Sequence, residues 1–316
     1  MEKDNELVSI IVPMRNAERY VSDALASILR ERQTPIEVIV VNDRSTDASL
    51  DQVLRFSDDR IRVIEGPGRG VAAALNAGLA EARGAIIMRC DADDLYPETR
   101  IGHQVAWLRS NPGYAAVCGS FSTIDDDGHL VSDFDCGVEP LEITRELSGG
   151  KVRTSLCTFA IRAEAMVRVG GYREYFELAS DIDFQLRLCE VGRIGFVPEL
   201  FYFWRLHESS MTHRQSVLGD FFERTAHDFQ KQRQTSGLDD LQREHPPIKP
   251  RAVPTRKNSA RAHIQGTLLG RAWREHDAGQ KGKALATGLR ALTVNPSDIR
   301  VWKSVLALAL RPTGSK

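Results

Sequence analysis

The 316-residue sequence has few cysteines and no long apolar run. Its five cysteines are odd in number and lie far apart, and no two have the C-x-x-C spacing of a zinc or redox motif. A disulfide framework is therefore not expected, and a reducing compartment is. No apolar run approaches the roughly 20 residues that cross a bilayer, and the charged residues 1–6 lack the apolar core of a signal peptide. We expect a cytoplasmic protein.

Two common phosphate-binding motifs are also missing. The pattern GxxxxGK[ST] does not occur, which argues against a Walker-type nucleotide site. Gly68-Arg69-Gly70 is not followed by a third glycine at the spacing of a dinucleotide fold, and it does not follow the first apolar run. The loop therefore gives no support for a dinucleotide cofactor, although Arg69 could neutralise a phosphate.

The net charge of −1 conceals an asymmetry along the chain. Residues 214–316 contain 19 Lys and Arg against 9 Asp and Glu, whereas residues 1–213 contain 23 against 34. The difference predicts two domains with different surroundings, 1–213 and a basic, mainly helical region 214–316. The basic region could meet an anionic membrane surface or nucleic acid, or it could cover the acidic part of the same chain.

Short apolar runs alternate with helical patterns over the first hundred residues. Continuous apolar runs of this length are typical of strands buried on both faces. The alternation predicts a parallel α/β sheet of a nucleotide-binding type. The expected strands are 7–12, 36–41, 61–65 and 84–88, and the expected helices are 17–29, 47–56 and 71–78.

Three aspartates, Asp91, Asp93 and Asp94, follow the fourth expected strand. On an extended chain Asp91 and Asp93 point to the same side. Two carboxylates that converge without a compensating cation suit Mg²⁺ or Mn²⁺. Because open α/β sheets bind ligands at the carboxyl ends of their strands, this stretch predicts a metal–diphosphate site. A solvated acidic turn or a helix N-terminus is the alternative.

Other polar groups allow both a structural and a functional interpretation. The run 125–128 ends in glycine and is interpreted as the solvated tip of a hairpin. Asp181 begins an expected helix, where the helix dipole favours a carboxylate whether or not it has a function. Arg205 and His207 lie on one side of an extended segment, and both can donate to phosphate oxygens.

The last part of the chain changes character. A stretch with four prolines between 246 and 254 predicts a linker. Helical patterns follow at 259–276, 281–292 and 298–310, and the last two are separated by a stop signal at 295–297. These helices could form a hairpin or an amphipathic lid on a membrane surface.

Seven motifs, in order over about the first 210 residues, together resemble family 2 glycosyltransferases, an inverting group with the GT-A fold. Each motif is weak by itself, and their order makes the resemblance specific. They are 8–13 (VSIIVP), 41–47 (VNDRSTD), Gly70 with 76–78 (NAG), 91–94 (DADD), 170–171 (GG), 181–183 (DID) with 186–187 (LR), and 205–207 (RLH).

The resemblance implies transfer of a single sugar from a UDP- or dTDP-linked donor to a glycan or lipid-linked acceptor. Asp181 would be the general base, with Asp183 as the fallback, and Asp93 with Asp91 would hold Mg²⁺ or Mn²⁺. We expect the basic region to contact the inner face of the cytoplasmic membrane peripherally, and we expect no nucleic-acid partner. The residues implied to bind the nucleotide sugar are Pro13, Asp43, Arg69, Asn76, Asp91, Arg205 and His207.

The sequence also departs from the family pattern. Ser180 stands where a Glu often precedes the base, and Arg44 stands where Gly is frequent. The absence of a QxxRW motif and of membrane spans argues against a processive synthase of the cellulose or hyaluronan kind. A sugar-nucleotide pyrophosphorylase is one alternative, although 13–16 (PMRN) replaces the glycine-rich loop of such enzymes. A degenerate nucleotide-sugar-binding module is the other.

Overall fold

The computed structural model describes residues 7–134, 136–208, 217–250 and 260–312. The strands are β1 (Val8–Met14), β2 (Ile36–Asn42), β3 (Ile61–Glu65), β4 (Ile86–Arg89), β5 (Tyr114–Ile124), β6 (Leu130–Asp133), β7 (Leu141–Glu142), β8 (Ala160–Arg162) and β9 (Arg193–Arg205). The helices are α1 (Val21–Leu29), α2 (Ser49–Leu54), α3 (Val71–Glu81), α4 (Arg100–Ser110), α5 (Thr144–Ser148), η1 (Leu156–Thr158, 3₁₀), α6 (Ala163–Val169), α7 (Ser180–Val191), α8 (Val217–Ser236), α9 (Ala260–Asp277), α10 (Lys281–Val294) and α11 (Ile299–Leu310).

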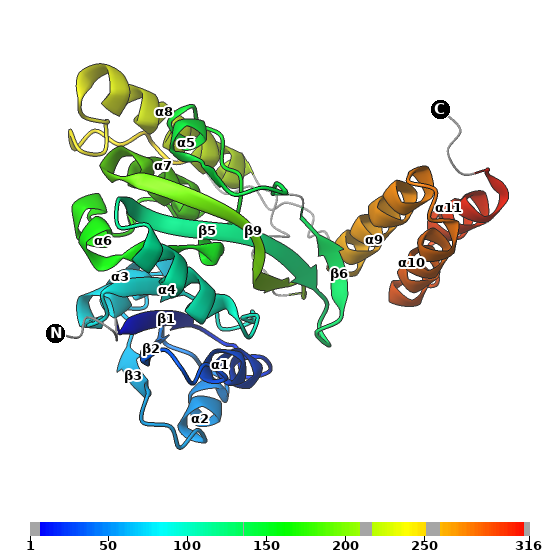
Figure 1. Cartoon of the computed structure of the whole chain (residues 1–316), viewed down its shortest axis with the longest axis horizontal. Helices are drawn as coiled ribbons and strands as arrows, with labels where there is room; N and C mark the ends of the chain where they lie inside the picture. Colours follow the sequence, from blue (N-terminus) through cyan, green and yellow to red (C-terminus); the bar gives the residue numbers. More distant parts are fainter. Residues whose placement is uncertain (1–6, 135, 209–216, 251–259, 313–316) are drawn as a thin grey trace. The chain divides into compact units, whose positions relative to one another are not determined.

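The strands form a mixed sheet in the order β3-β2-β1-β4-β8-β5-β9-β7, with β6 paired to β5. β1 to β4 are parallel, and β8 is antiparallel to β4 and β5. Helices lie on both faces of this sheet (Figure 1). That cover explains why β1 and β2 are almost continuously apolar and buried.

The order of the parallel strands reverses between β1 and β4. The chain steps outward from β1 to β2 and β3, and then returns to place β4 on the other side of β1. Because β-α-β connections are right-handed, the two directions put their helices on opposite faces. In agreement, α1 packs against α2, and α3 packs on β1 and β2. The gap beyond the carboxyl ends of β1 and β4 is the switch point where such sheets bind ligands.

The contacts divide the chain into two compact units. Among described residues, the first unit contains 7–121, 136–203 and 217–250, and the second contains 122–134, 204–208 and 260–312. α8 belongs to the first unit because Phe222 and Phe229 pack with Phe176 and Leu186. The two domains expected from charge, 1–213 and 214–316, remain a prediction.

The second unit has its own core. α9, α10 and α11 pack on one another, and buried residues of α9 pack with Val131 and Leu206. The turn between β5 and β6 is the hairpin tip expected from the sequence, closed by a hydrogen bond from the N–H of Gly128 to the carbonyl of Asp125 (3.0 Å). Gly128 has a φ of 85°, which explains its place in the acidic run. No helix among the described residues has the length and apolar character needed to cross a bilayer.

Candidate active site

The site begins where β4 leaves β1. Their pairing ends at Ile11 and Arg89, whereas β1 and β2 continue in register to Met14 and Asn42. Pro13 occupies this extra length of β1, opposite Val41 of β2. Proline has no N–H to donate, so it is tolerated where no strand pairs on that side. The local structure therefore leaves the carboxyl edge of β1 open beside the aspartates that follow β4.

The aspartates form a tight turn and not an extended segment. The N–H of Asp94 donates to the carbonyl of Asp91 (3.1 Å), and residues 92–93 are turn residues. The expectation that Asp91 and Asp93 point to the same side of an extended chain is therefore wrong. The backbone forms the acidic turn that was the alternative. The end of β4 places this turn at the switch point.

Arg89 compensates the charge of Asp91. Its Nε lies 2.6 Å from Oδ1 of Asp91, and its Nη2 lies 2.9 Å from Oδ2. Both side chains are largely shielded, at 14% and 28% exposed. The assumption that no cation balances the aspartates is thus incorrect. The signal was present in the sequence, because the two residues are two apart at the end of a strand.

Tyr202 fixes the aspartate turn from β9. Its hydroxyl donates to Oδ2 of Asp94 (2.7 Å) and accepts the N–H of Asp91 (3.0 Å). The next residue of each segment extends this contact, because Leu95 and Phe203 exchange two backbone hydrogen bonds of 3.0 Å. Asp94 is almost fully buried, so these bonds give it a structural role. No local sequence signal links two segments that lie more than a hundred residues apart.

Asp43 organises the glycine loop. It directly follows β2, is almost fully buried, and its carboxylate accepts the N–H groups of Gly68 (2.6 Å) and Gly70 (3.3 Å). A Cβ added to Gly66 would lie 2.7 Å from Oδ1 of Asp43, so only glycine permits this approach. Asp43 therefore holds the loop 66–70 at the edge of the switch point, and its contact with a nucleotide base remains a prediction.

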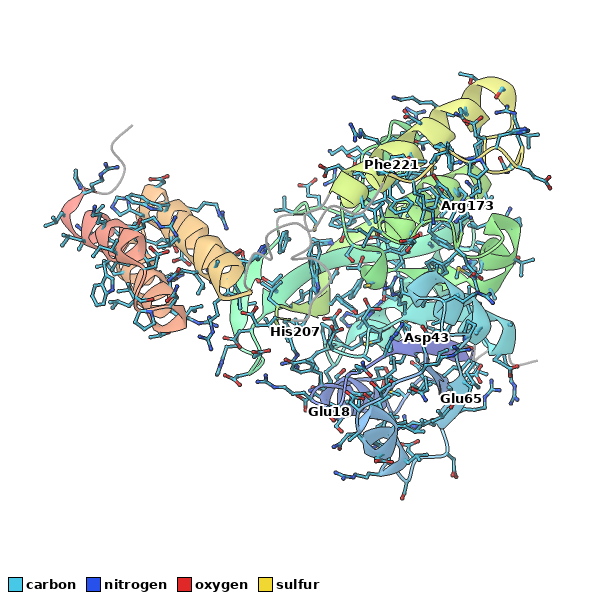
Figure 2. The ribbon with its side chains drawn as sticks, turned by 180° about the vertical axis from the view of Figure 1, so that it is seen from behind. Glu18, Asp43, Glu65, Arg173, His207 and Phe221 are labelled. Carbon is cyan, nitrogen blue, oxygen red and sulfur yellow. The ribbon has the colours of Figure 1, made fainter. Side chains whose placement is uncertain are left out.

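The loops after β1 and β2 are joined to each other. The side-chain carbonyl of Asn16 accepts the N–H of Thr46 (2.8 Å), and the carboxylate of Glu18 accepts the N–H of Ala48 (2.9 Å). Asn16 and Arg44 both have positive φ, at 53° and 59°. Figure 2 shows Glu18 and Asp43 within these neighbouring loops. Backbone in this uncommon region is held by its surroundings and often marks a functional loop.

Arg69 and Asn76 connect the glycine loop and α3 to the segment 171–174. Arg69 forms a two-point ion pair with Glu174, with both N–O distances 3.0 Å. The amide of Asn76 accepts the N–H of Tyr172 (2.8 Å) and donates to its carbonyl (2.7 Å). Both side chains therefore hold a loop, and their predicted proximity to the nucleotide stays a prediction.

Asp181 lies in the first turn of α7, in electrostatic contact with the end of β4. Burial raises the pKa of its carboxyl above the ordinary value of 3.8, and Asp91 raises it too, whereas Arg89 and the N–H of Ile182 lower it. Cys157 links the two segments, because its thiol lies 3.7 Å from Asp91 and η1 packs against α7. The side chain remains partly accessible to solvent.

The residue before this helix is in an uncommon backbone conformation. Ala179 has a φ of 56°, in the left-handed region that favours glycine. The surrounding packing must hold it there, since Ala179 lies against the aromatic cluster around Phe176 and Phe222. The conformation sets the direction in which α7 starts, and so where Asp181 points.

Asp183, the fallback base, is enclosed. Its side chain is 0% exposed and forms ion pairs with Arg187 (2.9 Å) and Arg173 (3.6 Å). Arg173 also pairs with Asp239 at 2.7 Å, which extends the network toward α8. Figure 2 labels Arg173 and, on α8, Phe221. Because an acceptor hydroxyl has no access to Asp183, the geometry favours Asp181.

Arg205 and His207 belong to the second unit. Nη1 of Arg205 donates to the carbonyl of Asp126 (2.8 Å), and the arginine is 2% exposed. It thereby holds the acidic turn between β5 and β6. His207, labelled in Figure 2, is also buried. The role predicted for both residues at the diphosphate stays a prediction.

Of the two predicted metal ligands, Asp91 and Asp93, only Asp93 is suited to bind a divalent cation in this structure. Both oxygens of Asp91 are engaged by Arg89, and the side chain of Asp93 is partly exposed on the turn. Within the described residues there is no group of three or more His, Cys, Asp and Glu side chains that could hold a metal. Mg²⁺ and Mn²⁺ can bind through one or two carboxylates with phosphate oxygens completing the shell. Asp93 fits that mode, and Asp91 fits it only when separated from Arg89.

The fold is that of a GT-A glycosyltransferase, as predicted. The structure of Staphylococcus aureus TarS, residues 1–349, in complex with UDP-GlcNAc aligns with 96% of this chain and 87% of that one. Its TM-score is 0.60 at 17% sequence identity, a likeness that shows the fold.

Residues 9–176 match the model of glycosyl transferase family 2, and the chain belongs to that family. Chondroitin synthase of Pasteurella multocida (strain Pm70) is 29% identical over 204 residues, 64% of this chain and 21% of that protein. Hyaluronan synthase of Pasteurella multocida is also 29% identical over 204 residues, and the match covers 20% of that protein. The chain thus spans about a fifth of the length of these two relatives. The predicted family is confirmed.

Proposed function

We propose that this chain is an inverting glycosyltransferase that moves one sugar from a nucleotide-diphosphate donor to a hydroxyl of a glycan or lipid-linked acceptor. The observation that carries the proposal is the contact made by η1, which packs against α7 and whose Cys157 thiol lies 3.7 Å from the carboxylate of Asp91. It joins a candidate base on α7 to the acidic turn after β4, at the switch point of the sheet. Family membership favours transfer over the pyrophosphorylase alternative.

Asp181 supplies the base in this proposal. Its carboxylate takes the proton of the acceptor hydroxyl while the oxygen attacks the anomeric carbon. The bond from that carbon to the diphosphate breaks, and its electron pair leaves with the diphosphate. A base with a raised pKa holds the proton more strongly than an ordinary aspartate, which suits this step. The anomeric configuration inverts because the displacement is direct.

The groups around the β1–β4 edge bind the donor. Asp43 and the loop 66–70 that it holds form the nucleotide side, and Pro13 lines it. Asp93 would hold Mg²⁺ or Mn²⁺, and the cation would supply positive charge to stabilise the departing diphosphate. Arg89 neutralises Asp91, which lowers the negative charge that the diphosphate would meet at the turn. A UDP-sugar donor is supported by the TarS structures, which contain UDP-GlcNAc and UDP.

A donor panel tests this proposal. The full chain is mixed with UDP- and dTDP-sugars with and without Mn²⁺, and the shift of its melting temperature is measured. We expect one donor to raise the melting temperature in a Mn²⁺-dependent way, and transfer from it to release the nucleoside diphosphate with inversion in the proton NMR spectrum of the product. Release of pyrophosphate from a nucleoside triphosphate and a sugar phosphate would overturn the assignment. Donor binding without hydrolysis or transfer would favour the binding module.

The location of the enzyme is part of the same proposal. A lipid-linked acceptor would be met at the cytoplasmic membrane face, and the basic region 214–316 suits a peripheral contact there.

A further inference from the structure

Helix α11 has one apolar face that the second unit uses. Val301, Val305 and Leu308 are buried at the contact with α9 and α10. These three residues recur at spacings of three and four, as expected for one side of a helix. One such face is enough to attach a surface helix to its core.

The same helix carries a second apolar face that is exposed. The exposed fractions are 64% for Ile299, 51% for Trp302, 60% for Leu306 and 74% for Leu310. Their spacings of three, four and four place them on one side of α11, and we call these four residues the apolar stripe. Among the described residues, none buries the stripe. Single exposed apolar side chains are normal, but a continuous row of large ones marks a contact surface.

The three helices that include the stripe carry a net positive charge. Residues 260–312 contain nine Lys and Arg and only three Asp and Glu. Lys303 is exposed on α11 itself, and Lys281 and Lys283 lie at the start of α10. Asp298 is engaged by Arg300 (2.8 Å), which leaves little negative charge beside the stripe. A protein partner is not specified by this pattern, whereas a surface of anionic phosphates is complementary to it.

Trp302 has the character of an interfacial anchor. Its indole N–H donates to the carbonyl of Pro296 (2.9 Å), so the polar end of the ring is satisfied while half of the side chain stays exposed. An aromatic side chain of this kind can enter the boundary between headgroups and acyl chains without burying an unpaired donor.

We propose that α11 lies in the surface of a membrane that contains anionic lipid, with the apolar stripe toward the acyl chains and the basic side chains at the headgroup phosphates. A helix with one apolar side and a basic border binds in this way without spanning the bilayer. The proposal names the lipid partner of this unit and does not depend on Asp181. Its test measures binding and not transfer, so the two can fail separately.

The test is sedimentation of the full chain with lipid vesicles. Phosphatidylcholine vesicles are compared with vesicles that also contain phosphatidylglycerol, at low and high salt. We expect binding to the anionic vesicles, weakened by salt, together with a blue shift of Trp302 fluorescence that is absent in Trp302→Phe. The double variant Leu306→Gln, Leu310→Gln should bind at least about tenfold more weakly. Since both side chains are exposed, far-UV circular dichroism should show an unchanged fold.

The matched control is Val167→Gln, at an apolar residue that is 81% exposed on α6 of the first unit. It should bind vesicles as the wild type does. The proposal is overturned if the wild type fails to bind anionic vesicles, or if the double variant binds them equally well. It is also overturned if light scattering shows a dimer that the double variant loses, because the stripe would then be covered by a second copy of the chain.

Discussion

Arg89 and Asp91, two residues apart at the end of β4, form a two-point ion pair with N–O distances of 2.6 and 2.9 Å. The pair places a built-in cation on the carboxylate that was expected to hold a metal. A divalent ion at Asp91 would therefore have to compete with Arg89 for that carboxylate. This competition gives a first test of the site.

Replacing Arg89 by Ala should strengthen Mn²⁺ binding several-fold. The change frees Asp91, and a partly buried ion pair of this kind is worth about 1 kcal/mol. Isothermal titration of Mn²⁺ in the presence of UDP measures the effect. The control is Arg62→Ala. This arginine of β3 pairs with Glu81 of α3, and its replacement should leave the affinity for Mn²⁺ unchanged. Equal Mn²⁺ affinities for wild type and Arg89→Ala would show that Asp91 takes no part in metal binding.

The pH dependence of transfer should report Asp181. Its pKa is raised by burial, and the base must be deprotonated, so the rate should fall with decreasing pH at a higher pH than an aspartate of ordinary pKa 3.8 would give. Arg89 lowers this pKa, so Arg89→Ala should move the acid limb of kcat/KM to still higher pH. If the acid limb does not move, Arg89 does not influence the pKa of the catalytic base.

The same pKa shift has a consequence for stability. A carboxyl whose pKa is higher in the folded than in the unfolded state makes folding less favourable as pH rises from the unfolded value through the folded one. Asp181→Asn removes this effect and should raise the melting temperature at neutral pH while it slows transfer. Thermal unfolding followed by circular dichroism measures it, and a lower melting temperature would contradict the desolvation of Asp181.

Asp183→Ala should act on stability. Asp183 is fully buried between Arg187 and Arg173, and removal of one partner from a buried ion-pair network typically costs about 3–5 kcal/mol. Urea unfolding measures the free energy of unfolding. A variant as stable as the wild type but unable to transfer sugar would return Asp183 to the position of base.

Asp43→Ala should weaken donor binding about tenfold or more. It removes the acceptor of two loop N–H groups, and a hydrogen bond to a charged group is worth roughly 1.5–3 kcal/mol. Titration of UDP measures the loss, with the exposed Asp51→Ala on α2 as the control. Unchanged affinity for UDP would remove Asp43 and the loop 66–70 from the nucleotide side.

The parallel part of the sheet could be predicted from the sequence because β1, β2 and β4 are buried on both faces. The runs that became β1, β2 and β3 are bounded by polar turns, and their alternation with helices permits few arrangements. The position of the aspartates at a strand end followed from the same pattern. Farther along the chain the pattern is less regular: residues 156–158 form η1, and β8 crosses the sheet only at Ala160–Arg162.

The contacts within the site depend on long-range packing, so they were harder to predict from the sequence. The clamp of Tyr202 on the turn 91–94 joins β9 to β4, and no local pattern encodes it. The roles of Asn76 and Arg69 as loop anchors likewise depend on the segment 171–174. The Arg89–Asp91 pair was available from spacing, and it was missed because the metal interpretation considered the carboxylates alone.

The most direct measurement compares single-turnover transfer and donor affinity in Asp181→Asn. The amide keeps the size of the side chain at the start of α7, but it cannot take the proton from the hydroxyl of the acceptor substrate. The account predicts a transfer rate lower by about 10²–10⁴ with an unchanged dissociation constant for the donor. A normal transfer rate, or a loss of rate explained fully by weaker donor binding, would contradict the account.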